Sequence, residues 1–234
     1  MKRIAIMQPY FFPYVGYFQL VKAVDTFIFY DDVNFIKRGW INRNNILLQG
    51  NKFLFSIPCV KPSQNDLIKD TEVNHGHPGL QKIKKTFFHA YNGQDNFEAV
   101  DALFKKVLSP ENKTIAEMAI ESVQLVADYL NMDTSFKISS KAYPQNRDLD
   151  KADRLIDIAQ KEGADTYINA IGGKELYDKG YFNEKGIQLY FLDPTLTPYK
   201  QSSDEFISGL SILDLLIHLP KEQVNEKLDD FTLL

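Results

Sequence analysis

Short apolar runs alternate with amphipathic stretches at the start of the chain. Apolar, β-branched runs that stop at a turn are typical of buried strands, and apolar positions recurring every three or four residues indicate helices. By this rule the pattern predicts a strand at 3–7 (RIAIM), a helix over 15–24 and a strand at 26–32 (TFIFYDD). Strand, helix, strand is the opening of an α/β sheet.

The middle of the chain departs from this alternation. Two β-prone stretches flank a Gly50-Asn51 turn dipeptide, which predicts a hairpin over 45–59. Helical periodicity then predicts helices at 79–92, 97–108 and 112–131, the last of them capped by Asn112.

The strand and helix alternation returns after residue 132. It predicts strands at 135–140, 166–170 and 187–193, and helices at 150–163 and 210–219. We therefore expect one domain over 1–234, with a mostly parallel, Rossmann-like three-layer sheet that is interrupted by a hairpin and a helical insertion at about 42–132.

Ligands bind such sheets at the carboxyl ends of the strands, which places the turn QPYFFPYVGY (8–17) at the mouth of the expected site. Core packing is the expectation for its phenylalanines. Gln8, Tyr14 and Tyr17 carry polar ends, and packing and ligand contact are equally good explanations for them. Gly16 lies where a helix begins, and the free backbone N–H groups of a helix start favour anions.

A second candidate stretch is DDVNFIKRGWINRN (31–44). Asp31 and Asp32 end a predicted strand and are candidates for a general base. The following cations and amides are suited to hold a phosphorylated ligand: Lys37, Arg38, Asn42, Arg43 and Asn44. The alternative is a solvated loop in which the two aspartates pair with the loop cations.

Two further motifs contribute weaker candidates. INAIGGKELY offers Asn169, a Gly172-Gly173 pair that permits close backbone approach, and Lys174 at the start of a short helix. The stretch YKQSSDEF…LSILD offers polar residues beside an apolar helix: Tyr199, Gln201, Ser211 and Asp214. Helix capping explains Ser211 as well as a ligand does.

Composition narrows the class of protein. With 44% hydrophobic and 25% charged residues, the chain suits a globular enzyme. A net charge of −4 and a pI near 5.6 argue against nucleic-acid binding, so we expect a small-molecule substrate. No run approaches the roughly 18 apolar residues of a membrane span. Cys59 is the single cysteine, and a cytoplasmic location is expected.

The remaining chemistry-bearing residue types predict little. His75 and His77 lack matching ligands, so we predict no metal site. His89 and His218 lie among apolar residues of predicted helices, where a partly buried histidine is usual. The G-x-S-x-G spacing is absent and Cys59 resembles a strand residue, so covalent catalysis is not predicted.

Resemblance to the WbqC-like protein family is carried by three stretches: IAIMQPYFFPYVGYFQLVKAVDTFIFYDDVNFIKRGWINRN, GADTYINAIGGKELYD and YKQSSDEF…LSILDLL. It runs from Met1 to about His218. Members of this family are found with O-antigen and other surface-polysaccharide biosynthesis genes, and a glycine transferase role has been suggested for some. The resemblance implies that biosynthetic setting.

In its expected fold the chain also resembles the HUP-like nucleotidyltransferases of the HIGH signature and their pantothenate synthetase relatives. Those proteins carry H-x-G-H after the first strand, where YVGY stands here, so Tyr14 and Tyr17 replace the histidines and Gly16 is retained. Tyrosine donates one hydrogen bond but supplies no positive charge. Either Lys37, Arg38 or Lys174 supplies that charge to a nucleotide, or only a ligand pocket remains.

Together these observations predict a transferase that adds a small acyl or aminoacyl group, glycyl among the candidates, to a sugar or sugar nucleotide. The expected substrates include ATP or a sugar nucleotide, with no dedicated cofactor. The alternatives are a non-catalytic protein that delivers a nucleotide-sugar to a glycosyltransferase or other polysaccharide-biosynthesis partner, and a HIGH-type nucleotidyltransferase.

Overall fold

The computed structural model describes all 234 residues, and its centre is a six-stranded sheet in the order β5-β2-β1-β6-β7-β8. The strands are β1 (Arg3–Met7), β2 (Thr26–Phe29), β5 (Ser135–Ile138), β6 (Thr166–Ala170), β7 (Gln188–Pro194) and β8 (Phe231–Leu233). All neighbouring pairs are parallel except β7 and β8. The predicted Rossmann-like α/β fold is confirmed, because the parallel strands follow the third-second-first-fourth-fifth order of that fold.

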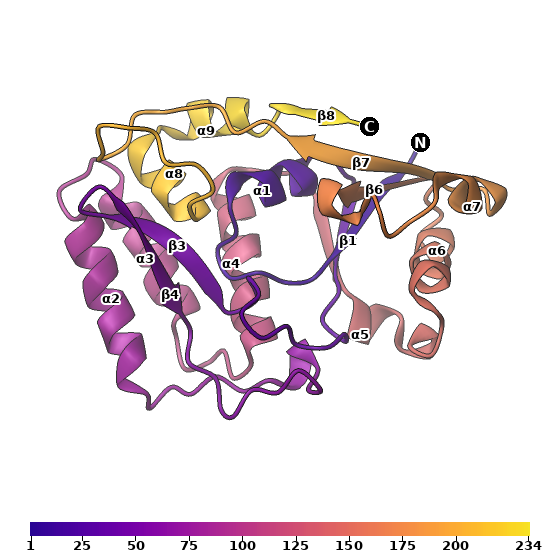
Figure 1. Cartoon of the computed structure of the whole chain (residues 1–234), viewed down its shortest axis with the longest axis horizontal. Helices are drawn as coiled ribbons and strands as arrows, with labels where there is room; N and C mark the ends of the chain where they lie inside the picture. Colours follow the sequence, from indigo (N-terminus) through magenta and orange to yellow (C-terminus); the bar gives the residue numbers. More distant parts are fainter.

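Helices cover both faces of the sheet (Figure 1). On one face α1 (Val15–Lys22) and α4 (Ile115–Tyr129) share an apolar core with Ala5 and Phe27 of the strands. On the other face α6 (Lys151–Lys161) and α7 (Lys179–Glu184) pack with Ile6 and Ile28. Successive strand residues point to opposite faces, so the central strands β1 and β2 are apolar at every position after the first.

The segment between β2 and α4 forms the predicted hairpin and helical insertion. It holds β3 (Arg43–Leu48), β4 (Asn51–Ser56), α2 (Pro78–Tyr91) and α3 (Phe97–Val107). Figure 1 shows the hairpin, α2 and α3 grouped on the side away from α6 and α7. The larger core continues from the sheet into this insertion, through Phe55, Phe87 and Phe104, so apolar burial joins the two parts.

Several element ends differ from the prediction. The hairpin turns at Gln49 and Gly50, because Asn51 already pairs with Leu48. Thr114, and not Asn112, caps α4, since its hydroxyl accepts from the Glu117 N–H while the Glu117 carboxylate accepts from the Thr114 N–H. The predicted strand at 135–140 stops at Ile138, where α5 (Ser139–Ala142) begins.

The C-terminal elements are absent from the sequence prediction. After α8 (Ile212–His218) the chain forms α9 (Lys221–Lys227) and then β8, which adds the antiparallel edge of the sheet. The polar KEQVNEK stretch has little helical apolar periodicity and FTL is very short, so tertiary packing decides both elements.

A buried carboxylate joins the start of β1, strand β5 and the end of α6. Glu162 accepts hydrogen bonds from Lys2 at 3.0 Å, Lys137 at 2.7 Å and the Tyr143 hydroxyl at 2.5 Å. Burial alone raises the pKa of this carboxyl, but the three hydrogen bonds outweigh that effect and lower the pKa to about 2. The ionised form of Glu162 therefore stabilises the fold.

We expect Glu162→Gln to lower the free energy of unfolding by about 1–2 kcal/mol at neutral pH, since both lysines are partly screened by solvent. A lowered folded-state pKa stabilises fully above the unfolded-state value and loses its effect as the pH falls toward 2. Urea unfolding at a series of pH values should therefore show the difference shrinking below about pH 4.5. Glu184→Gln, at an exposed glutamate without partners, is the control. A difference that does not change with pH would contradict this account.

Candidate functional site

The carboxyl ends of β1 and β6 separate at the edge of the sheet. These strands pair only at Arg3–Thr166 and Ile4–Tyr167, whereas β6 pairs with β7 as far as Ala170. The chain leaves β1 for α1 on one face, and it leaves β6 for α7 on the other. This is the topological switch point where open α/β sheets bind ligands.

Asn169, at the end of β6, keeps its amide donors free. Its Oδ1 accepts from the Ala170 N–H at 2.8 Å, and this is the side chain's one hydrogen bond within the protein, so Nδ2 is left without a protein partner. The amide lies over Gly173, where a Cβ would meet Nδ2 at 2.4 Å. Gly173 therefore permits the position of this side chain, which offers two N–H donors at the switch point.

The aromatic turn after β1 is a buried loop whose backbone is held by distant side chains. Phe11 and Phe12 are fully buried, as predicted for the phenylalanines. The Phe12 N–H donates to Ser122 Oγ at 2.9 Å, and its carbonyl accepts from Ser211 Oγ at 2.7 Å and from Asn44 Nδ2. Asn44 and Ser211, both predicted to contact ligand, are thus occupied by the turn itself.

The tyrosines of the turn divide into two kinds. Tyr17 is 3% exposed, and its hydroxyl donates to the Gln8 carbonyl at 2.9 Å. Tyr10 and Tyr14 are half-buried, and burial raises the pKa of both phenols, which keeps them protonated as donors. The Tyr14 ring lies over Gly16, where a Cβ would come within 2.5 Å of it.

Asp31 and Asp32 come together with residues that the sequence analysis did not single out. Asp31 accepts from the Ser139 hydroxyl at 3.0 Å, the Ser140 N–H at 3.0 Å and the Ser140 hydroxyl at 2.6 Å. Asp32 is 2.5 Å from Ser139 Oγ and from Arg154 Nη2. A single hydroxyl hydrogen serves one carboxylate at a time, so Ser139 is shared between them.

Arg154 is the buried counter-ion of this cluster. Its side chain is 4% exposed, its Nε donates to Asn146 at 3.0 Å, and its guanidinium lies 4.6 Å from the centre of the Tyr30 ring. The expected alternative, in which the aspartates pair with the cations of their own loop, is wrong. An arginine on the apolar face of α6, beside Leu155 and Ile158, was the available signal, because a charge is buried only with a partner.

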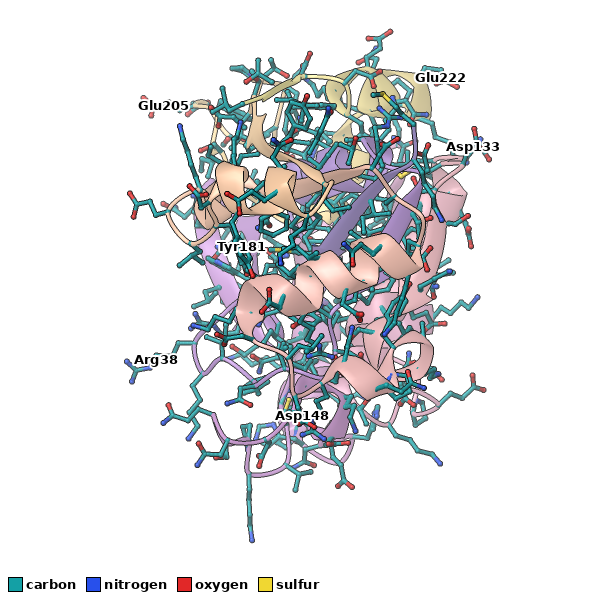
Figure 2. The ribbon with its side chains drawn as sticks, turned by 90° about the vertical axis from the view of Figure 1, so that its right-hand side faces the viewer. Arg38, Asp133, Asp148, Tyr181, Glu205 and Glu222 are labelled. Atoms are coloured by element: carbon teal, nitrogen blue, oxygen red, sulfur yellow. The ribbon has the colours of Figure 1, made fainter.

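The loop cations lie apart from the aspartates. Lys37 and Arg38 are exposed, and Figure 2 shows Arg38 projecting away from the body of the protein. Arg43 donates to the carbonyls of Gly39, at 3.0 Å, and Arg38. Asn42 donates to the Ile57 carbonyl at 2.9 Å, so its amide supports the hairpin base.

The Gly-Gly motif ends differently from the prediction. Ile171–Gly173 form one 3-10 turn, and Lys174 ends it rather than starting a helix; α7 begins at Lys179 behind the Asp178 cap. Lys174 is exposed, and no Cβ contact restricts Gly172. The following residues Leu176 and Tyr177, with Tyr181 and the start of α6, line an open hollow; Figure 2 shows Tyr181 beside α6.

Tyr199, Gln201 and Asp214 meet in the interior. Asp214 is fully buried and accepts from Tyr199 at 2.6 Å, from Gln201 at 3.1 Å and from Tyr91 of α2 at 2.8 Å. Burial raises the pKa of both phenols, and the nearby carboxylate raises it further, so the tyrosines remain donors. Sequence position alone gave no sign of Tyr91.

Two of the histidines and the cysteine have structural roles or surroundings. His77 caps α2 by accepting from the Gly79 N–H, and His75 Nε2 lies 2.7 Å from the Asn112 carbonyl. No group of three or more His, Cys, Asp or Glu side chains is arranged to hold a metal ion. Burial raises the pKa of the Cys59 thiol to about 12, which leaves it protonated. None of the helices is long and apolar enough to span a membrane.

The fold defines a Rossmann-like α/β protein, a class in which ligands bind at the switch point of the sheet. The chain belongs to the WbqC-like protein family, whose model matches residues 8–226. It is similar to the uncharacterized protein Rv1507c of Mycobacterium tuberculosis (strain ATCC 25618 / H37Rv). The two are 27% identical over 225 residues, which cover 95% of this chain and 96% of that protein. The family resemblance of the sequence motifs is confirmed.

We expect Arg154→Met to lower the free energy of unfolding by about 3–5 kcal/mol, because it leaves Asp32 buried without its counter-ion. Adding Asp32→Asn should restore part of that loss. Urea unfolding followed by circular dichroism measures both. Arg147→Met, at an exposed arginine without partners, should change stability by less than about 0.5 kcal/mol. Equal losses in the two arginine variants would contradict a buried ion pair.

Gly172 and Gly173 provide a test of how closely Asn169 packs on the backbone. Gly173→Ala should displace the Asn169 amide, break its hydrogen bond to the Ala170 N–H and lower the free energy of unfolding by about 1–2 kcal/mol. Gly172→Ala meets no atom within 4 Å and should change stability by less than about 0.5 kcal/mol. Urea unfolding of the two variants compares them directly, and indistinguishable values would refute the close packing of Asn169 on Gly173.

Proposed function

We propose that this chain is a transferase of surface-polysaccharide biosynthesis that adds a small acyl or aminoacyl group, such as glycyl, to a sugar or sugar nucleotide. Support for the setting comes from the family to which the chain belongs. Support for the ligand class comes from the switch point, where free amide donors and partly exposed aromatic side chains lie at the carboxyl ends of neighbouring strands.

The arrangement around Asn169 is the observation that carries this proposal. Asn169 is the last residue but one of β6, Tyr10 follows β1 and Tyr30 follows β2, so all three lie at the carboxyl edge. The Tyr30 N–H bonds to the Met7 carbonyl at 2.8 Å, which brings the ends of β1 and β2 together. Tyrosine rings pack on sugars and bases, and phenol and amide N–H groups donate to hydroxyl or phosphate oxygens.

We assign Asp31 and Asp32 a positioning role, although the sequence made them candidates for a general base. Both carboxylates are nearly buried and accept hydrogen bonds from Ser139, Ser140 and Arg154. A general base must reach the proton that it removes. In this proposal the two aspartates position the start of α5 and α6 near the switch point.

The same observation favours a second candidate, a non-catalytic protein that binds a nucleotide-sugar and delivers it to a polysaccharide enzyme. A site that offers hydrogen-bond donors while Asp31 and Asp32 are held by Ser139, Ser140 and Arg154 can bind a ligand without transforming it. The nucleotidyltransferase alternative gains less support, because Tyr17 points its hydroxyl at the Gln8 carbonyl. Tyr14 and Tyr17 therefore do not form the paired ligand contacts that the two histidines make in HIGH-type proteins.

We expect UDP- or dTDP-linked amino sugars to bind the purified chain, as measured by isothermal titration calorimetry. Asn169→Ala should weaken Kd about tenfold, the effect of one lost hydrogen bond. Asn183→Ala makes the same substitution at an exposed residue near the end of α7 and should leave Kd unchanged. If none of these sugar nucleotides binds, or if both variants weaken binding alike, the switch point is not the site.

Turnover separates the candidate functions. Mass spectrometry of the sugar after incubation with acyl and aminoacyl donors should detect the acylated product. Asp31→Asn and Asp32→Asn keep the shape of each side chain; loss of product at unchanged Kd would assign that aspartate to the chemistry. Tight binding without product from any donor would favour the delivery protein, and pyrophosphate release from ATP would favour the nucleotidyltransferase.

A further inference from the structure

A serine, a histidine and a side-chain amide form a hydrogen-bonded chain at the far end of α8 from the aromatic turn. Ser202 Oγ lies 2.9 Å from His218 Nε2, and Gln94 Nε2 donates to Ser202 Oγ at 3.3 Å. These residues come from three segments of the chain: the α2–α3 connection, the loop after β7, and the last turn of α8. They lie outside the switch point, and the proposed function does not use them.

The contact of His218 Nδ1 determines which atom donates in the hydrogen bond between Ser202 and His218. His218 Nδ1 lies 2.8 Å from the Asp214 carbonyl oxygen, one helical turn earlier. A carbonyl only accepts, so Nδ1 carries the hydrogen and Nε2 presents its lone pair to the Ser202 hydroxyl. The side chain of His218 is 6% exposed, which holds the ring in one orientation, whereas Ser202 is exposed to solvent.

A buried carboxylate places negative charge beside the His218 ring. The Asp214 carboxylate lies 3.6 Å from His218 Nδ1 and is itself held by Tyr91, Tyr199 and Gln201. A fixed, buried carboxylate stabilises the imidazolium that forms when Nε2 takes a proton. The rings of Tyr91 and Tyr199 have their centres 6.0 and 6.4 Å from that of His218 and keep this side of the imidazole covered.

We propose that Ser202 is a nucleophile for activated acyl esters, with His218 as its general base and Asp214 as a positioning residue. Ser202 Oγ forms a bond to the carbonyl carbon, and its proton passes to His218 Nε2. The bond from that carbon to the leaving oxygen or sulfur then breaks, and the leaving group takes the proton from Nε2. Water adds to the acyl-serine by the same route, which releases the acid and restores Ser202.

Gln94 has a separate role in this step. Its Nε2 donates to Ser202 Oγ at 3.3 Å, which leaves the hydroxyl hydrogen to point at His218 Nε2, so Gln94 positions the nucleophile. The sequence gave no sign of this arrangement, because Ser202 lacks the flanking glycines of a G-x-S-x-G turn and lies 16 residues before its base. The expectation that covalent catalysis is not indicated rested on that missing motif.

Labelling with a fluorophosphonate tests the proposal, because this probe phosphonylates serines that a base activates. We expect one adduct on the folded wild-type chain, located at Ser202 by peptide mass spectrometry, and none after heat denaturation. Ser202→Ala should abolish it. His218→Gln should slow labelling by about 100-fold or more, the usual contribution of a general base. Hydrolysis of p-nitrophenyl acetate should fall in parallel.

Ser203→Ala is the matched control, since this neighbouring serine donates to the Glu205 carbonyl and does not contact His218. Its labelling rate should stay within about twofold of wild type. Thermal unfolding checks that each variant is folded, and if His218→Gln does not fold, the labelling of wild type and Ser202→Ala decides the question. No adduct on the wild type, an adduct at another serine, equal labelling of the denatured chain, or an unchanged rate in folded His218→Gln would overturn the proposal.

Discussion

The buried backbone of the Phe11–Phe12–Pro13 turn is the constraint on which the rest of the structure depends. A buried peptide group without a partner costs about 1–3 kcal/mol, and this turn lies inside the core. Its groups are satisfied by Ser122 of α4, Asn44 of β3, and Ser211 with the Ile212 N–H at the start of α8. Since these partners come from the sheet helices, the insertion and the C-terminal region, one short turn fixes all three around the end of β1.

Buried polar side chains elsewhere follow the same rule. Arg154 is paired with Asp32, and Asp214 is surrounded by two phenols and an amide, because a buried charge is tolerated only with partners. Many residues that look like ligand contacts in the sequence therefore serve the interior. Asn169 is a candidate whose Nδ2 has no protein partner at the switch point of the sheet.

Helix α8 connects the two regions of chemical interest. Its first end bonds to the aromatic turn through Ser211, and its last turn presents His218 to Ser202. Tyr91 bonds both to the Leu47 N–H of the hairpin and to Asp214 of this helix, so the insertion also supports the buried carboxylate. A substitution in the hairpin can therefore alter the position of α8 through Tyr91. The switch point is formed by other elements, the carboxyl ends of β1 and β6.

The sequence by itself determined the α/β class, the five parallel strands, the hairpin and the larger helices, because apolar periodicity reports burial locally. It also placed the phenylalanines of the turn in the core. The tertiary structure alone decided that Arg154 and not Arg38 meets Asp32, that Thr114 caps α4, and that α9 and β8 form. These contacts join residues far apart in the chain or depend on packing geometry, and a local pattern carries no information about such pairs.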